Sequence, residues 1–291
     1  MTGSDGNSAD GAARDDIALA SPTDVASAAA DVSVIIPNFN YGAYVAEAIE
    51  SVLRQACACR IETIVVDDGS TDRSLDVIGR YPVTVVAQRN AGVAMARNAG
   101  ALHAAGKFLL FLDADDVLEP DCIARYLAAL DDAAAHVAYA YTQARMFGDV
   151  ERVDLSRPFS RAALLRRNFV PVSALIRRHA FMDAGGFDHR FGYEDYELWV
   201  RLALRGQIGL LVPAPLMRYR IHADSRNARA QHHWNELRWR IRGTYPWAYP
   251  RQMLPHPRQA LHWLAQQREV RRLRPDLAAA PAHWVSRATR A

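Results

Sequence analysis

Four short apolar runs, separated by segments with helical periodicity, constrain the fold of this chain more than any other feature. The runs cover residues 32–37, 61–66, 83–87 and 108–112. Strands that alternate with helices in this way are typical of a parallel sheet with helices packed on its faces. The runs are apolar almost throughout, which fits strands that are buried on both sides. The sequence therefore predicts an α/β fold with a Rossmann-like, mainly parallel sheet flanked by helices.

Polar or acidic residues follow three of the four predicted strands. The first strand leads into Pro37-Asn38-Phe39-Asn40, the second into Asp67-Asp68, and the fourth into Asp113-Ala114-Asp115-Asp116. In parallel sheets, ligands bind beyond the carboxyl ends of the strands. These three segments are therefore expected to meet at one edge of the sheet and to form a ligand site there.

The acids at this edge suit a hard divalent cation. Asp113 and Asp115 are two residues apart, so in an extended segment their side chains lie on the same side. Carboxylates that lie close together repel each other, and a cation held by carboxylate, water and phosphate oxygens removes that repulsion. The alternative is that aspartates after strands only form turns and cap helices, which Asp67, Asp72 and Asp116 are all placed to do. Ser70 or Thr71 is expected to cap the helix that follows the second strand.

Four stretches of the sequence resemble the family 2 glycosyltransferases in content, order and spacing. They are SVIIPNFNYGAYVAEAIESVLRQ, IVVDDGSTDRS, RNAGVAMARNAGALHAAGKFLLFLDADD and GGFDHRFGYEDYELWVRLALRG. The resemblance covers residues 32–222. It implies a GT-A fold, a nucleotide-sugar donor, a divalent metal such as Mn²⁺ or Mg²⁺, and inverting transfer to a glycan or lipid-linked acceptor. Bacterial surface-polysaccharide assembly is the expected context.

The resemblance also assigns residues to the nucleoside of the donor. Pro37 and Phe39 would lie along the nucleobase. The family more often has tyrosine at the position of Phe39, and a phenyl ring still stacks on a base but offers no hydroxyl group. Asp68 would accept hydrogen bonds from the base or ribose, with Asp67 as a supporting neighbour.

The diphosphate and the metal would be held by acidic and basic groups together. Asp113 and Asp115 form the DxD-type motif, in which Asp115 would bind the metal and Asp113 the ribose or the metal. His222 would complete the metal shell or contact the diphosphate; the alternative is a structural histidine. Arg97 and Arg220 would neutralise phosphate charge, or they are ordinary surface arginines.

An inverting transfer also needs a base to accept the proton of the acceptor hydroxyl group. A helix is predicted to begin at Glu194-Asp195, because Leu198, Trp199 and Leu202 then fall on one face. The positive end of the helix dipole favours ionised carboxylates in that first turn. The resemblance implies that Asp195 is the base and that Glu194 contacts the acceptor or orients the loop. The alternative is that both only cap the helix.

Outside residues 32–222 the composition changes. Residues 1–31 contain almost no large apolar side chains, so a disordered leader is expected, and they lack the pattern of a signal peptide. No run of apolar residues is long enough for a transmembrane helix, so a cytoplasmic protein is expected. The three cysteines, Cys57, Cys59 and Cys122, are expected to be reduced thiols.

Residues 223–291 are expected to form a basic, tryptophan-rich helical extension. Residues 218–291 hold 15 arginines against 4 acidic residues, whereas residues 1–217 hold 20 basic and 28 acidic residues. An amphipathic helix is predicted within residues 259–273. The extension would cover the sheet with its arginines outward, or it would contact an anionic membrane surface on the inner face of the cytoplasmic membrane. No recognised nucleic-acid-binding motif occurs, so no nucleic-acid partner is expected. Its tryptophans are Trp234, Trp239, Trp247, Trp263 and Trp284.

Other functions on a similar sheet fit the sequence less well. An NAD-linked oxidoreductase needs a glycine-rich turn after the first strand, where this chain has Pro37-Asn38-Phe39-Asn40. A sugar nucleotidyltransferase needs a glycine-rich phosphate loop with a basic residue, which is also missing. A catalytically silent nucleotide-sugar-binding or scaffold protein remains as the alternative, and the presence of Asp68, Asp113, Asp115 and Asp195 argues against it.

Overall fold

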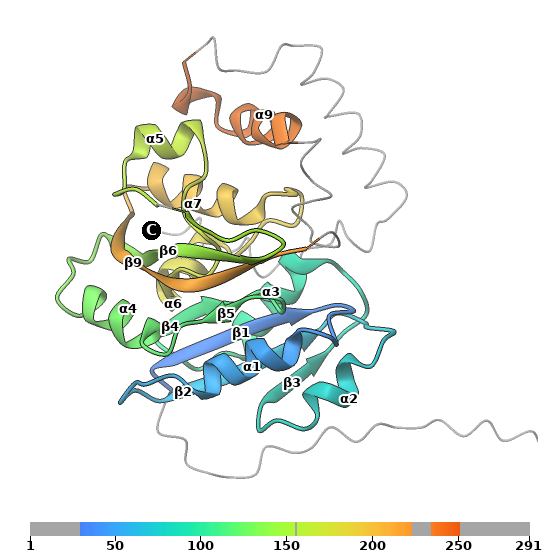
Figure 1. Cartoon of the computed structure of the whole chain (residues 1–291). Coiled ribbons are helices and arrows are strands. Elements are labelled where there is room, and N and C mark those ends of the chain that lie inside the picture. Colours follow the sequence, from blue (N-terminus) through green and yellow to red (C-terminus); the bar gives the residue numbers. More distant parts are fainter. Residues whose placement is uncertain (1–29, 155, 223–233, 251–291) are drawn as a thin grey trace, which may run out of the picture.

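The computed structural model describes residues 30–154, 156–222 and 234–250, and its centre is a nine-stranded sheet with helices on both faces (Figure 1). The strands lie in the order β3-β2-β1-β4-β8-β6-β9-β5, and β7 pairs with β6. The strands are β1 (Val32–Asn38), β2 (Ile61–Asp67), β3 (Thr84–Ala87), β4 (Phe108–Phe111), β5 (Val117–Leu118), β6 (Val137–Gly148), β7 (Arg152–Asp154), β8 (Leu175–Arg177) and β9 (Ile208–Ile221). The helices are α1 (Val45–Leu53), α2 (Ser74–Ile78), α3 (Val93–His103), α4 (Cys122–Asp131), α5 (Arg161–Arg166), α6 (Arg178–Ala184), α7 (Glu194–Leu204) and α9 (Trp234–Thr244), followed by the 3₁₀ helix η2 (Pro246–Ala248).

The sheet has two parts with different strand directions. Strands β3, β2, β1 and β4 pair in parallel and form what we call the parallel half, which contains all four strands predicted from the sequence. Beyond β4, strand β8 is antiparallel to both β4 and β6, while β9 is parallel to β6. The long strands β6 and β9 curve away from the plane of the parallel half (Figure 1). The predicted α/β fold with flanking helices is therefore confirmed.

The core is divided by the sheet because successive side chains of a strand point to opposite faces. Ile35 of β1 and Phe111 of β4 belong to the cluster that includes Trp199 of α7. Val34 and Leu110 point the other way and belong to the cluster built on α1 and α4. Strands covered on both faces are largely apolar, which is why β1 and β4 appear as nearly continuous apolar runs, whereas the edge strand β3 is mostly exposed.

Helix α3 lies unusually close to the parallel half. A Cβ atom at Gly100 would lie 2.4 Å from Cγ2 of Ile35 and 3.0 Å from Cγ2 of Val66. A residue larger than glycine at position 100 of α3 would therefore force the helix or the side chains of β1 and β2 to move. Arg97 lies one turn earlier in α3, so this close contact also sets the position of the Arg97 backbone.

Helix α2 begins later than the sequence predicted. Ser70 or Thr71 was expected to cap it, but the helix starts at Ser74, whose backbone N–H donates to Oδ1 of Asp72 at 2.9 Å. The hydroxyl group of Ser70 instead accepts a hydrogen bond from the backbone N–H of Asn40 at 3.0 Å. The prediction was wrong because Ser70 joins the ends of β1 and β2, a contact between segments that local capping rules do not consider.

The cysteines also differ from expectation. Cys57 and Cys59 form a disulfide, with their Cα atoms 5.2 Å apart, so the prediction of reduced thiols is wrong for this pair. One residue separates the two cysteines, and this spacing places their Cα atoms within the usual Cα–Cα distance for a disulfide. Cys122 is a buried free thiol of α4, as predicted.

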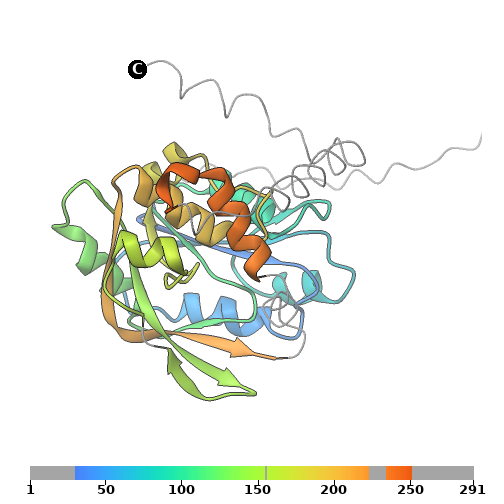
Figure 2. The ribbon, with the colours of Figure 1, turned by 90° about the horizontal axis from the view of Figure 1, so that it is seen from above.

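The described part of the C-terminal extension, α9 and η2, packs beside α7 (Figures 1 and 2). Ile241 and Tyr249 are buried, and the hydroxyl group of Tyr245 donates to Glu197 of α7. The predicted leader, the predicted helix at 259–273, Trp263 and Trp284 lie outside the described residues. The division of the chain into residues 1–31, 32–222 and 223–291 stays a prediction. None of the helices in the described part of the chain has the length and apolar character needed to cross a bilayer.

Candidate functional site

The ends of β1 and β2 meet at one edge of the sheet, as the sequence predicted. Asn38 and Asp67 are opposite each other in the parallel register, and Nδ2 of Asn38 donates to Oδ1 of Asp67 at 3.1 Å. Pro37 is buried within β1, whereas the ring of Phe39 is 42% exposed just beyond it. An exposed aromatic ring next to buried polar groups is the arrangement expected of a surface on which a base can stack.

Asp68 organises the segment that leads into α3. Its Oδ1 accepts hydrogen bonds from Nε2 of Gln88 at 2.7 Å and from the backbone N–H of Ala91 at 2.8 Å. Its Oδ2 accepts one from the backbone N–H of Gly92 at 2.8 Å. Asp67 accepts a hydrogen bond from the backbone N–H of Ser70 at 3.0 Å. Both carboxylates therefore hold loops at this edge, and their roles toward a base or ribose stay predictions.

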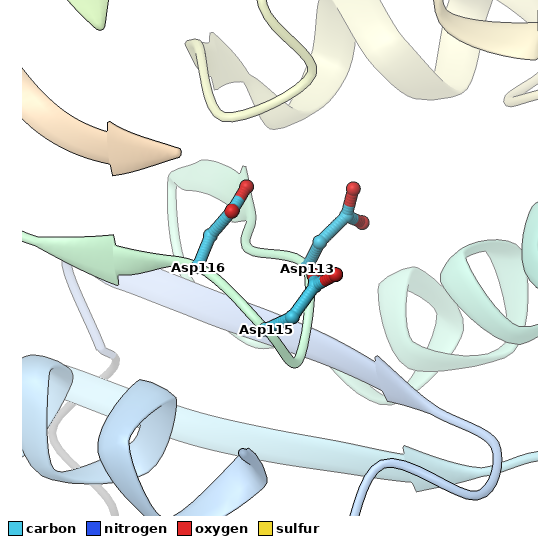
Figure 3. Close-up of side chains that lie close together, drawn as sticks. All are labelled: Asp113, Asp115 and Asp116. Carbon is cyan, nitrogen blue, oxygen red and sulfur yellow. The ribbon is translucent and has the colours of Figure 1, made fainter. Parts of the chain in front are cut away.

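Three aspartates form what we call the acidic cluster: Asp113, Asp115 and Asp116. One carboxylate oxygen of each lies within 4.8 Å of the others, and Asp113 and Asp116 point to the same side (Figure 3). The segment is a turn, closed by a hydrogen bond of 3.0 Å from the backbone N–H of Asp116 to the carbonyl oxygen of Asp113. The extended conformation expected from the sequence is therefore wrong, and the turn is what adds Asp116 to the cluster.

Burial and mutual repulsion act on the carboxylates of the acidic cluster. Burial raises the pKa of Asp115, and the negative charge of Asp113 raises it further. Burial also raises the pKa of Asp116 well above its usual value, with the charges of Asp115 and Asp113 adding to the effect. Within the described part of the chain, Oδ2 of Asp116 is buried without a hydrogen-bond partner. Three close carboxylates, one with an unpaired buried oxygen, fit the oxygen ligands that Mg²⁺ and Mn²⁺ prefer.

His222 lies against the acidic cluster, where the sequence placed it. Its Nε2 is 3.0 Å from Oδ2 of Asp115. The imidazole ring is in contact with two aromatic rings at the start of α1, with centroid distances of 6.1 Å to Tyr41 and 5.0 Å to Tyr44. These rings orient the imidazole beside Asp115, and the role of His222 as a metal ligand stays a prediction.

Arg220 is fixed between the acidic cluster and α1. Its Nε donates to the carbonyl oxygen of Asp115 at 2.9 Å, and one Nη donates to Glu47 at 2.8 Å. The guanidinium group lies over the rings of Tyr44 and Phe147, at 5.0 Å and 4.3 Å from their centroids. The sequence had not identified Glu47, which joins Arg220 across 173 positions of the chain. Arg220 thus supports the turn that carries Asp115, and its contact with a diphosphate stays a prediction.

Arg97 connects the acidic cluster to the start of α7. It is only 2% exposed, and one Nη donates to Glu194 at 2.6 Å while the other donates to Asp113. Its guanidinium group also lies over the ring of Phe187, 5.5 Å from the centroid. A surface arginine was the alternative reading of this residue, and it is wrong because the side chain is buried between two carboxylates.

The two acids at the start of α7 have different surroundings. Glu194 is buried and paired with Arg97, whereas Asp195 is half-buried. Oδ2 of Asp195 accepts a hydrogen bond of 3.1 Å from Nδ2 of Asn168, on the loop after α5. Asn168 carries no signal in the sequence, because its contact with Asp195 depends on how α5 packs against α7. The helix start at Glu194 was predicted correctly.

Comparison with known proteins identifies the family. The family described as glycosyl transferase family 2 matches residues 33–187. The chain is 45% identical over 100 residues to the uncharacterized glycosyltransferase alr2836 of Nostoc sp., covering 32% of this chain and 31% of that protein. It is 32% identical over 169 residues to the succinoglycan biosynthesis protein ExoO of Rhizobium meliloti, covering 56% of this chain and 46% of that protein. The chain thus spans less than half the length of both relatives.

A solved structure shares the fold. The mannosyltransferase PcManGT of Pyrobaculum calidifontis, in complex with GDP-Man and Mn²⁺, superposes with a TM-score of 0.55 at 20% identity, covering 83% of this chain and 76% of that one. At this identity the likeness shows the fold, which confirms the predicted GT-A class. Because the matched residues 33–187 make up more than half of the chain, the protein belongs to glycosyl transferase family 2.

Proposed function

We propose that this protein transfers a sugar, with inversion, from a nucleoside-diphosphate sugar to a hydroxyl group of a glycan or lipid-linked acceptor in polysaccharide assembly. Membership of family 2 supports sugar transfer. A relative named for succinoglycan biosynthesis supports the context, and a neighbour bound to GDP-Man and Mn²⁺ supports the donor class.

The position of Arg97 is the strongest support for this function. A single buried guanidinium group contacts Asp113 of the acidic cluster and Glu194, the neighbour of Asp195. The group proposed to bind the donor and the group proposed to activate the acceptor therefore belong to one connected site. A protein that only bound a nucleotide-sugar would need the first of these groups but not the second.

Asp195 is the proposed base. As the acceptor oxygen bonds to the anomeric carbon of the sugar, the hydroxyl proton moves to the carboxylate of Asp195, and the bond from that carbon to the diphosphate breaks. Glu194 cannot serve equally well because its carboxylate is buried and engaged by Arg97. Its proposed role is to keep α7 in place beside the acidic cluster.

The acidic cluster is the proposed site of the metal and of the donor diphosphate. Asp115 and Asp113 would hold Mn²⁺ or Mg²⁺, with His222 beside them. The cation would supply positive charge where negative charge develops on the departing diphosphate. Arg220 holds the turn of the cluster through the carbonyl oxygen of Asp115, which keeps the carboxylates close together. Phe39 would stack on the base, beside Pro37 and Asp68.

The described end of the extension supports contact with a membrane surface. Trp247 of η2 is 76% exposed, and α9 before it carries Arg238, Arg240 and Arg242. An exposed indole ring near arginines suits the interface of an anionic bilayer. Peripheral binding to the inner face of the cytoplasmic membrane would bring α7 near lipid-linked acceptors, and flotation with anionic liposomes tests this.

A screen of nucleotide-sugars tests the function. The full chain is incubated with each donor and Mn²⁺, with and without EDTA, and release of nucleoside diphosphate and formation of product are measured. We expect turnover with at least one donor, loss of turnover with EDTA, and a product whose anomeric configuration, read by NMR, is opposite to that of the donor. Donor binding without any turnover would favour the catalytically silent alternative, and retention of configuration would contradict the role of Asp195.

A further inference from the structure

The amide group of Asn168 has a fixed orientation in front of Asp195. Its Oδ1 accepts a hydrogen bond of 3.1 Å from the backbone N–H of Val170, and its Nδ2 donates to Oδ2 of Asp195 at 3.1 Å. A rotated amide would lose the first bond and place an oxygen against the carboxylate. The two contacts therefore agree on one orientation, in which the N–H donor faces Asp195.

The chain is held in place on both sides of Asn168. Before it, the hydroxyl group of Tyr196 donates to the carbonyl oxygens of Leu164 and Leu165 at 2.8 Å and 3.2 Å. After it, Val170 is 1% exposed in the core. Tyr196 follows Asp195 directly in α7. These contacts therefore keep the distance and orientation between the amide of Asn168 and the carboxylate of Asp195 constant.

Different groups hold the three acids in the first turn of α7. Glu194 is held by the guanidinium group of Arg97, and Glu197 by that of Arg201 at 2.7 Å. Such an ion pair directs the carboxylate at its arginine. The amide of Asn168 instead fixes the direction of the Asp195 carboxylate through one of its two oxygens. Of these three acids at the start of α7, the proposed base is the one for which the structure shows a contact with a neutral amide.

We propose that Asn168 is the positioning residue for the base: its N–H holds Oδ2 of Asp195 and thereby directs the carboxylate toward the acceptor hydroxyl group. This inference rests on the proposed role of Asp195. Asn168 acts through Asp195 and not on the donor, so its loss should lower the rate of transfer and leave donor binding unchanged.

The substitution Asn168→Asp tests this most sharply. It keeps the shape of the side chain and an oxygen that accepts the hydrogen bond from the N–H of Val170. It replaces the N–H group that faces Asp195 by a carboxylate oxygen, which cannot donate a hydrogen bond. We expect kcat to fall by about 10- to 100-fold, because a small misplacement of a reacting group has effects of that size. The KM for the donor should change by less than about two-fold. Asn168→Ala should behave similarly, and Asn168→Gln, which keeps an amide donor, should recover part of the rate.

A matched control separates positioning from local folding. Ser160 caps the same α5 by accepting a hydrogen bond of 3.3 Å from the backbone N–H of Ala163, and it does not contact Asp195. Ser160→Ala should lower Tm but leave kcat unchanged. If Ser160→Ala lowers kcat as much as Asn168→Asp, the effect is one of folding and the inference is overturned.

The remaining outcomes distinguish this inference from the proposed function. If the wild-type protein transfers sugar, Asp195→Asn does not, and Asn168→Asp is as fast as the wild type, only the role of Asn168 is overturned. If the wild-type protein transfers no sugar from any donor, or if Asp195→Asn keeps full activity, the proposed base itself is wrong, and the role of Asn168 is overturned with it.

Discussion

The two sides of the candidate site are assembled in different ways. On the donor side, the polar residues come from the ends of adjacent parallel strands, as with Asn38 and Asp67, and the acidic cluster is one continuous turn. On the base side, the residues come from distant parts of the chain: Asn168 from the loop after α5, Glu194 from α7, and Tyr245 from the position before η2. The donor side thus follows from strand topology, whereas the base side depends on packing between helices.

The two sides also differ in charge balance. The carboxylates of Asp115 and Asp116 have raised pKa values through burial and mutual repulsion. At the start of α7, by contrast, Glu194 and Glu197 are each paired with an arginine. Glu194 and Glu197 are therefore balanced by neighbouring arginines, whereas the acidic cluster has the charge that the proposed cation would balance. This difference leads to four predictions, each of which affects the two sides unequally.

The largest effect is expected on the base side, from Asp195→Asn. Loss of a general base costs up to about 10⁴-fold, and we expect kcat for transfer to fall by at least about 10³-fold. The donor side is untouched, so the dissociation constant of the donor, measured by calorimetry, should stay the same. A variant that binds the donor much more weakly would show that the two sides are not separate.

The substitution Arg97→Met removes the only side chain among the described residues that contacts carboxylates on both sides. It leaves Glu194 buried without its counter-charge, so the free energy of unfolding should fall by about 3–5 kcal/mol, measured by urea denaturation. In the Arg97→Met background, Glu194→Gln should restore part of this loss because it removes the uncompensated charge. Absence of any such restoration would contradict the ion pair as the cause.

Asp115→Ala affects the donor side alone. It should abolish most of the increase in Tm that Mn²⁺ causes and lower the rate of transfer by about 10²-fold, because charge on the leaving diphosphate is then poorly stabilised. Asp76→Ala is the control, since Asp76 is an acid of α2 whose side chain is 68% exposed and pairs with Arg73. An equal loss of the Mn²⁺ effect in this control would argue against a specific metal site.

The smallest effect is expected from Tyr245→Phe. It removes the hydrogen bond between η2 and Glu197 and should lower the free energy of unfolding by about 1–2 kcal/mol. The rate of transfer should change by less than about two-fold, because Arg201 still holds Glu197. A large loss of activity would mean that the C-terminal extension contributes directly to the base side.

Sequence reasoning recovered the donor side more fully than the base side. The strand ends at Asn38 and Asp67 and the acids at 113–116 follow from periodicity and from the rule that ligands bind at carboxyl ends of parallel strands. The helix start at Glu194 was also predicted, because the apolar face of α7 is visible in the sequence. All of these features depend on neighbours within a few residues or on the general topology of the sheet.

The remaining features depend on contacts that no local pattern specifies. Asn168 is one polar residue in a short loop until α5 packs against α7. Asp116 joins the acidic cluster only because the segment turns, and Arg97 becomes a buried link only because α3, β4 and α7 meet around it. Sequence-based rules describe single elements and give no distances between them.

Helix α3 packs so closely on β1 and β2 that the geometry of the site depends on Gly100, a residue outside the proposed binding and catalytic groups. One added methyl group at Gly100 would overlap Cγ2 of Ile35, which a Cβ atom would approach to 2.4 Å, so the helix would have to tilt. Arg97 lies one turn from Gly100 in the same helix, so a tilt of α3 would also displace the guanidinium group of Arg97. We therefore expect Gly100→Ala to lower the rate of transfer, although every proposed catalytic side chain is still present. The residues of the site alone would not explain this loss of activity.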